Sequence, residues 1–314
     1  MISRRNIRVK VMQTLYTLVS LGKDENNTTF NVITSPQKLL QNHFDQSRKL
    51  LIYLIHFLTE VARQSESVAH QRASKHLPSV EDLNVNTKIA GNEVMWKMLE
   101  SPSYMQLASL DRPELIIDKP LLKKVFQNLE QSNEYLRYIS TNERNNSDEK
   151  AILEFIFETH MLQNENFTSH LEDLFSNWED DGESTIQVLM SFIHKPTSTD
   201  LREIVGKEKM EFAKTLLSTV LDKEEQLQTY IFPKLNNWDS DRIALLDMII
   251  MKMGVAEFLF FETIPPKVTI NEYIDISKDF STNQSGQFVN GILDNIHKDL
   301  VNDGKLNKTD FKKA

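Results

Sequence analysis

The sequence predicts an all-α protein, and three observations support that prediction. Apolar residues recur at spacings of three and four over long stretches, as they do on one face of an α-helix. Only 8 glycines and 9 prolines interrupt the 314 residues. No stretch of useful length alternates apolar and polar residues as a strand would. The predicted helices are 4–21, 36–66, 86–101, 119–139, 148–163, 167–178, 184–194, 207–231, 240–263, 269–280 and 285–300.

Breaks between these helices coincide with residues that disfavour continuation. They fall at the polar run 22–31, at Pro78, at Pro102 and Pro113, at the run 141–147, and at Lys195-Pro196. Proline removes a backbone donor and clashes with the preceding turn, so it commonly stands at a helix end.

The overall composition is that of an ordinary globular protein without disulfides. Hydrophobic residues make up 40%, charged residues 26%, and the formal net charge is −9. The chain has no cysteine, which excludes disulfides, thiolate catalysis and cysteine-ligated zinc and fits a reducing compartment. The apolar run 50–58 is too short to cross a bilayer, and 243–261 contains Asp247, Lys252 and Glu257. We therefore expect a cytoplasmic protein with no membrane partner and a buried core helix at 243–261.

Motifs of catalysis and metal binding are missing from the sequence. No two of the 8 histidines are four residues apart, and no G-x-S-x-G turn occurs. Gly286 and Gly291 have the spacing of a phosphate loop, but Ile292-Leu293 replaces the required Lys-Ser/Thr pair. The sequence thus predicts no enzyme, no cofactor and no metal site. We expect Gly291 instead to let two helices approach closely.

The segment from residue 264 to residue 294 contains the most specific pattern in the chain. Pro265-Pro266 is expected to close one helix, and Thr269 with Glu272 to form a T-x-x-E capping box for the next. Ser285 is expected to cap a last helix over 285–300. The pattern predicts two packed helices joined by a short polar loop.

The N-terminal helix concentrates positive charge in an acidic protein. Residues 1–23 contain five basic side chains and no acid: Arg4, Arg5, Arg8, Lys10 and Lys23. Such a cluster is typical of polyanion binding, although basic residues can also merely solubilise a terminal helix. Arg8 falls beside the apolar face of this helix, where it must either act or extend its head group to solvent.

Both segments resemble the NusB family of transcription antitermination factors. The string IPPKVTINEYIDISKDFSTNQSGQFVNGILD at 264–294 resembles the family's C-terminal signature, and SRRNIRVKVMQTLY at 3–16 resembles its arginine-rich opening helix. The resemblance implies an all-helical protein of two small bundles. It also implies binding of single-stranded boxA-like RNA with NusE, a small-subunit ribosomal protein. That complex joins elongating RNA polymerase and promotes transcription of ribosomal RNA.

The resemblance implies particular site residues as well. Arg4, Arg5 and Arg8 would bind phosphates, with Lys10 as a nearby cation. The residues Phe280, Gln287 and Asn290 match RNA-facing positions, and Asp247 matches an acidic position near the NusE-facing bundle. Two alternatives stay open: Phe280 can fill the core where two helices meet, and Asp247 can pair with Lys252 or another neighbour.

Departures from the family pattern lie beside these positions. Family members usually carry a histidine and a lysine or arginine where Gly286 and Gln287 stand, and often an acid at Gln284. Asn6 replaces a frequent arginine. The loss of cations is expected to weaken RNA binding or to shift part of it elsewhere in the chain.

The resemblance also predicts the organisation of the chain. Residues 1–22 and 206–302 are expected to form one discontinuous NusB-like bundle, with the first helix packed on the last ones. A helical region at 23–205 is inserted after the first helix, and 303–314 form a polar tail. Residues 177–181 and 237–241 are similar, so the insert is a possible degenerate duplication. The alternative function is a helical protein-interaction scaffold with weakened or lost RNA binding.

Overall fold

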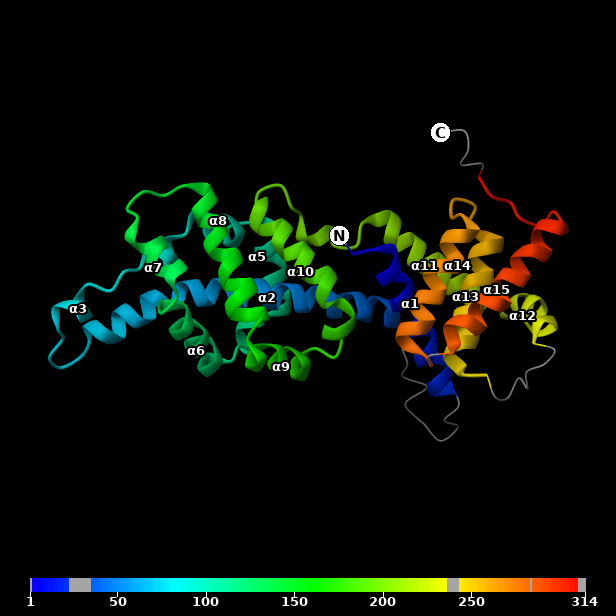
Figure 1. Cartoon of the computed structure of the whole chain (residues 1–314), viewed down its shortest axis with the longest axis horizontal. Coiled ribbons are helices and arrows are strands. Elements are labelled where there is room, and N and C mark those ends of the chain that lie inside the picture. The colour runs from blue at the N-terminus through cyan, green and yellow to red at the C-terminus, as the bar shows by residue number, and fades with distance from the viewer. Residues whose placement is uncertain (1, 23–34, 236–242, 283, 310–314) are drawn as a thin grey trace. The chain divides into compact units, whose positions relative to one another are not determined.

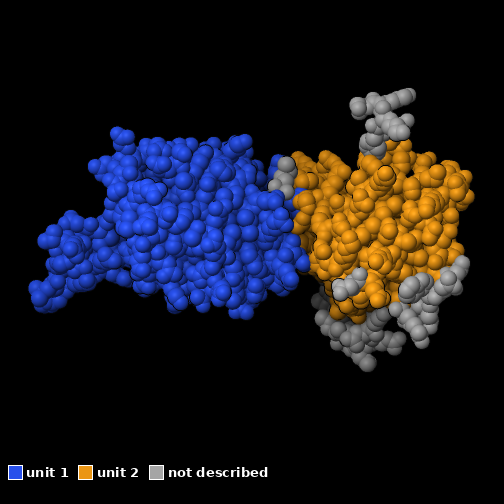
Figure 2. Space-filling model, in the orientation of Figure 1, with its two compact units in different colours: residues 1–2, 45–205 blue, residues 3–44, 206–314 orange. Residues whose placement is uncertain are grey.

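The computed structural model describes residues 2–22, 35–235, 243–282 and 284–309 (Figure 1). Within those ranges every regular element is a helix, so the all-α prediction is confirmed. The chain divides into two compact units (Figure 2): unit 1 comprises Met1–Ile2 and Asp45–Val205, and unit 2 comprises Ser3–Phe44 and Gly206–Ala314. None of the described helices is long and apolar enough to cross a membrane.

Unit 1 is built around the helix α2 (Pro36–Ala73), which enters this unit at Asp45. From Leu50 to Leu58 this helix is buried on nearly every side, as is typical of a helix that is apolar all round. Its other elements are α3 (Val80–Leu83), η2 (Lys88–Gly91), α4 (Glu93–Leu99), α5 (Pro102–Asp111), η3 (Pro113–Leu115), α6 (Lys119–Glu130), α7 (Asn133–Ser140), α8 (Asn146–Phe155), the π-helix η4 (Ile156–Leu162), α9 (Glu165–Leu174), α10 (Trp178–His194) and η5 (Leu201–Glu203).

A side-chain cap explains one difference between the predicted and the observed helices of unit 1. The predicted helix 119–139 is two helices, because the hydroxyl of Ser132 accepts a hydrogen bond from the backbone N–H of Tyr135 and starts α7. The predicted break at Pro102 is present, since α4 ends at Leu99, but the helix α5 that begins at Pro102 was not predicted. Pro102 occupies the first turn of α5, where a missing N–H costs nothing.

Unit 2 is built around the helix α13 (Leu245–Phe260). Five helices pack against it: α1 (Arg4–Gly22), α11 (Lys207–Asp222), α12 (Glu224–Ile231), α14 (Pro266–Phe280) and α15 (Ser285–Asn302). A short turn of 3-10 helix, η6 (Phe232–Lys234), follows α12. The prediction of a buried core helix is confirmed, since α13 is buried almost throughout. The predicted helix 207–231 is interrupted at Lys223, between α11 and α12.

The turns around α14 and α15 differ from the predicted ones. Pro266 begins α14 rather than ending α13, and it lies in the first turn of that helix. Thr269 is therefore inside α14, and the predicted capping box is wrong. Ser285 is the first residue of α15 rather than its cap, and its hydroxyl donates to the carboxylate of Asp247 at 2.8 Å.

Close helix approach depends on a different glycine from the predicted one. A Cβ on Gly254 of α13 would lie 2.8 Å from the Cδ2 atom of Leu293 on α15. A Cβ on Gly291 would meet nothing within 4 Å, so the predicted role of Gly291 is wrong.

Several predictions fall outside the described residues. These are most of the polar break 22–31, the start of the helix 240–263, the second copy of the internal similarity at 237–241, and the last part of the tail, 310–314. Before that point, Lys308 donates hydrogen bonds to the backbone carbonyls of Glu257 and Phe261, both at 2.7 Å. The segment around Lys308 thus contacts the C-terminal end of α13.

Candidate nucleic-acid interface

Arg4 and Arg5 lie on the surface of unit 2, in the first turn of α1. Arg4 is 44% exposed and its Nη2 atom lies 2.5 Å from a carboxylate oxygen of Glu208 on α11. Arg5 is 34% exposed and pairs with Asp279 in the last turn of α14. The guanidinium of Arg4 also lies 5.9 Å from the ring centre of Phe212, which orients it. Both arginines are accessible to a ligand, but each already contacts an acid.

Arg8 lies inside unit 2, although it belongs to the same basic cluster in the sequence. Its side chain is 2% exposed, and its Nε and Nη2 atoms donate to the two carboxylate oxygens of Glu257 at 2.7 and 3.0 Å. The same carboxylate accepts from the hydroxyls of Thr269 and Tyr273 at 2.9 and 2.8 Å. Glu272 adds a second acidic partner to Arg8 at 3.2 Å. Thr269 and Glu272, the residues of the predicted capping box, thus contact the buried ion pair of Arg8 and Glu257.

The charges in this buried network stabilise one another. Burial by itself would lower the pKa of Arg8, but the hydrogen bond and charge of Glu257 raise it overall. Burial, followed by the charge of Glu257, raises the pKa of Tyr273 well above its usual value. Arg8 therefore stays a cation and Tyr273 a neutral donor. Lys10 is also buried, at 1% exposure, so the four described residues of the basic cluster divide into two at the surface and two in the interior, while Lys23 lies outside the described residues.

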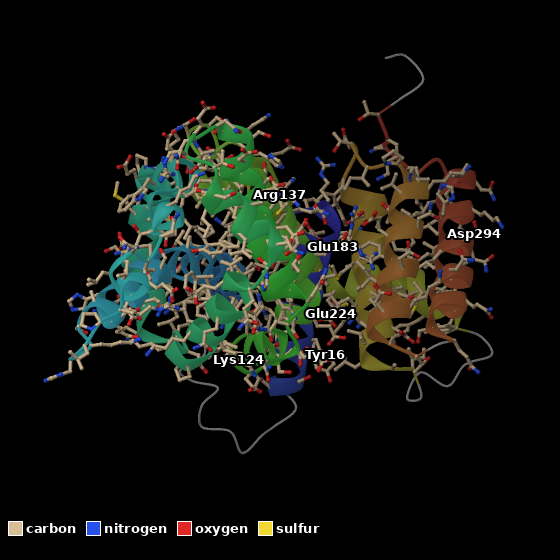
Figure 3. All side chains as sticks on the ribbon, turned by 60° about the vertical axis from the view of Figure 1, so that its left-hand side comes forward. Tyr16, Lys124, Arg137, Glu183, Glu224 and Asp294 are labelled. Carbon is tan, nitrogen blue, oxygen red and sulfur yellow. The ribbon has the colours of Figure 1, made fainter. Side chains whose placement is uncertain are left out.

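Two polar side chains predicted to face RNA lie on the outer face of α15. Gln287 and Asn290 are one turn apart and exposed, and neither makes a hydrogen bond to any described residue. The same face continues to Asp294, labelled in Figure 3, which pairs with Lys298 at 2.6 Å. Gln287 and Asn290 therefore offer free amide groups, and an acid bounds them on the C-terminal side.

The last turn of α14 lies between Arg5 of α1 and the first turn of α15. Its residue Asp279 contacts Arg5 on one side. The adjacent Lys278 extends over Gly286, so that a Cβ on Gly286 would lie 2.8 Å from the Lys278 Cγ atom. Gly286 leaves room for this lysine, whose side chain is 58% exposed and whose Nζ atom lies 3.4 Å from the carboxylate of Asp275. Lys278 is not predicted from the sequence, because its contact with Gly286 joins two helices. The sequence feature that could have indicated this contact is Gly286, a small residue where the family usually carries a histidine.

Phe280 and Asp247 lie near this surface in different environments. Phe280 is the last residue of α14, is half-buried, and makes no aromatic ring contact with a described residue. Asp247 is 5% exposed, and its carboxylate accepts from Ser285 at the start of α15. The alternative pairing of Asp247 with Lys252 is wrong, because Lys252 pairs with Glu224.

Comparisons with known proteins decide the family. A sequence model described as the NusB family matches residues 174–298. The chain is 36% identical over 139 residues to the transcription antitermination protein NusB of Salinibacter ruber, a match that covers 44% of this chain and 82% of that protein. The chain belongs to the NusB family. The family predicted from the sequence is confirmed, and the matched residues include the C-terminal motif at 264–294.

Two further NusB proteins match shorter parts of the chain. The NusB of Chloroherpeton thalassium is 36% identical over 99 residues, covering 32% of this chain and 47% of that protein. The NusB of Desulfatibacillum aliphaticivorans is 38% identical over 102 residues, covering 32% of this chain and 71% of that protein. No solved structure matches the chain. The NusB family match begins at Leu174 and includes α10 of unit 1 together with α11 to α14 and most of α15 of unit 2.

No cluster of side chains in the described ranges could hold a metal ion. The arrangement in unit 2 provides exposed guanidinium, ammonium and amide groups around the end of α14, which are donors suited to phosphates and base edges.

Proposed function

We propose that this NusB family member is a transcription antitermination factor without catalytic activity. It binds single-stranded boxA-like RNA together with NusE, in the cytoplasm, and joins elongating RNA polymerase to promote transcription of ribosomal RNA. The observation that supports this most is the arrangement at the end of α14. Arg5 of the N-terminal motif and Gly286 of the C-terminal motif both contact that single turn, through Asp279 and Lys278.

In this proposal the exposed residues contact RNA and the buried ones hold the surface in place. Arg4, Arg5 and Lys278 bind phosphates, while Gln287 and Asn290 bind base edges. The half-buried ring of Phe280 stacks on a base. Arg8 and Lys10 act from the interior by fixing α1, and Asp247 acts by holding Ser285 at the start of α15. Unit 2 carries the NusB-like function.

Fluorescence anisotropy with a boxA-like RNA and a scrambled RNA tests the proposal, with and without purified NusE. Each phosphate contact to a single strand contributes about 0.7 to the slope of log K against log salt, so three contacts give a slope of about −2. Replacing Arg4 and Arg5 together with alanine should reduce the slope to about −0.7 and weaken both RNAs alike. Replacing Asn290 with alanine should instead reduce the difference in affinity between the boxA-like RNA and the scrambled RNA.

The matched control changes two cations of the same unit that form no ion pair within the described part of the chain. Lys214 on α11 and Lys223 after it are exposed and make no ion pair with a described residue. Their double alanine variant has the same net charge as the double arginine variant and should keep the wild-type slope. A protein that binds NusE but neither RNA would favour the competing proposal, a protein-interaction scaffold whose RNA binding is lost.

A further inference from the structure

Arg4 and Arg5 of unit 2 each form an ion pair with an acid from another helix. Arg4 pairs with Glu208 in the first turn of α11, and Arg5 pairs with Asp279 in the last turn of α14. Glu208 is 82% exposed and Asp279 is 57% exposed, so water reaches both pairs. These acids lie outside the motif residues assigned to RNA binding.

We infer that Glu208 and Asp279 set the RNA affinity of this chain by competing with phosphates for Arg4 and Arg5. This inference rests on the proposed RNA-binding function and adds two residues that limit it. An acid that holds a guanidinium must leave when a phosphate arrives, or must remain next to the phosphate.

Either outcome weakens RNA binding. If the carboxylate leaves, the contact between arginine and acid is lost. If it remains, two negative groups share one guanidinium and repel each other. The contact of Arg4 with Glu208 uses only its Nη2 atom, so a phosphate can approach the other donors while the carboxylate stays close.

The positions of Arg5 and Asp279 show why this pair forms. Arg5 lies in the first turn of α1, where the helix dipole disfavours a cation, and Asp279 lies in the last turn of α14, where it disfavours an anion. Each charge offsets the unfavourable position of the other. A phosphate bound to Arg5 would offset the unfavourable position of Arg5 equally well, but Asp279 would then lack its cation at the end of α14.

The fold does not depend on these exposed pairs. Exposed ion pairs add little to stability because water screens them. The amide variants Glu208→Gln and Asp279→Asn keep the side-chain shape and remove one negative charge each. They should therefore fold as the wild type does, which a thermal melt verifies.

The test measures affinity for a boxA-like RNA by anisotropy at fixed salt. Each amide variant should bind about two- to five-fold more tightly than the wild type, the range that exposed ion pairs correspond to. The double variant should show the product of the two effects, because the two pairs share no residue. The salt slope should stay unchanged, since the number of phosphates contacted is the same.

Glu211→Gln is the matched control. Glu211 lies one turn after Glu208 on α11, is exposed, and makes no ion pair with a described residue. The substitution Glu211→Gln removes the same negative charge as Glu208→Gln, one turn further along α11, but frees no arginine. Tighter binding by Glu208→Gln and Asp279→Asn than by Glu211→Gln supports the inference.

The possible failures are distinguishable. Salt-dependent binding by the wild type, with equal affinities in Glu208→Gln, Asp279→Asn and Glu211→Gln, overturns the inference and leaves the proposed function intact. Weaker binding by Asp279→Asn also overturns it, because the acid would then be positioning Arg5. If no variant binds RNA, the proposed function fails and the inference fails with it.

Discussion

Arg8 on α1 and Glu257 on α13 form a buried, two-point ion pair that joins helices 249 residues apart in the sequence. Both side chains are at most 2% exposed. The sequence places Arg8 in a basic cluster, and the structure places it among three further partners of the same network, Glu272, Thr269 and Tyr273. The pair holds the N-terminal motif against the C-terminal helices.

The loss of one member of this pair is expected to destabilise unit 2. Arg8→Leu leaves the carboxylate of Glu257 buried without its cation, at a cost of about 3–5 kcal/mol in the free energy of unfolding. Urea denaturation measures that change. The double variant Arg8→Leu/Glu257→Leu should be more stable than Arg8→Leu, because it leaves no unpaired charge.

Arg4→Ala is the control for this prediction. Its pair with Glu208 is exposed, so the change should be no more than about 1 kcal/mol. Equal effects of Arg4→Ala and Arg8→Leu would contradict the structural role assigned to Arg8.

Phe280→Ala is expected to lower RNA affinity more than stability. Its ring is half-buried at the end of α14, and stacking of a base on an aromatic ring contributes about 1–3 kcal/mol. Anisotropy and thermal melting of the same preparation separate the two effects. Phe258→Ala, at a fully buried position of α13, should cost about 3–5 kcal/mol of stability. A Phe280 variant that melts like the Phe258 variant and binds RNA normally when folded would remove Phe280 from the site.

Alanine substitutions at two glycines are expected to have opposite effects. Gly254→Ala places a Cβ 2.8 Å from Leu293 and should destabilise the packing of α13 on α15 by about 1–3 kcal/mol. Gly291→Ala meets no neighbouring atom and should stabilise α15 by up to about 1 kcal/mol through helix propensity. Chemical denaturation compares the two. Destabilisation by Gly291→Ala would mean that a partner helix does occupy that face.

Unit 1 is expected to become less stable as the pH falls below about 6.5, because of His160. This residue lies in the π-helix Ile156–Leu162, and its Nε2 atom is buried without a hydrogen-bond partner. Burial lowers its pKa, and the charge of Glu134 opposes that shift only in part. The unfolded state therefore binds the proton first as pH falls below the ordinary histidine pKa of about 6.5. Stability decreases through that window and levels off below the lowered pKa of the folded state.

Urea denaturation at pH 7.5, 6.5 and 5.5 checks this pH dependence. His160→Gln should reduce the pH dependence without abolishing it, because burial also lowers the pKa of His56 in the same unit. An unchanged pH profile in His160→Gln would show that His160 does not contribute.

The sequence by itself determined the class of the fold and most of its helices. Spacing of three and four residues reports which face of a segment is apolar, and that local property persists in the folded chain. The core helix at 243–261 follows from its long apolar run with few charges, whereas the positions of Gln287 and Asn290 followed only from the family resemblance. The C-terminal motif at 264–294 lies within the residues that the NusB family model matches, and the family predicted from the sequence is confirmed.

Only the tertiary structure decided which residues of the basic cluster reach solvent. Arg4, Arg5 and Arg8 look alike in sequence, and their acidic partners come from three different helices, at Glu208, Asp279 and Glu257. Helix periodicity fixes contacts three or four residues away, whereas an ion pair across the core depends on how distant segments pack. The same reason explains Thr269, whose motif predicts a helix cap while its hydroxyl binds the buried carboxylate of Glu257.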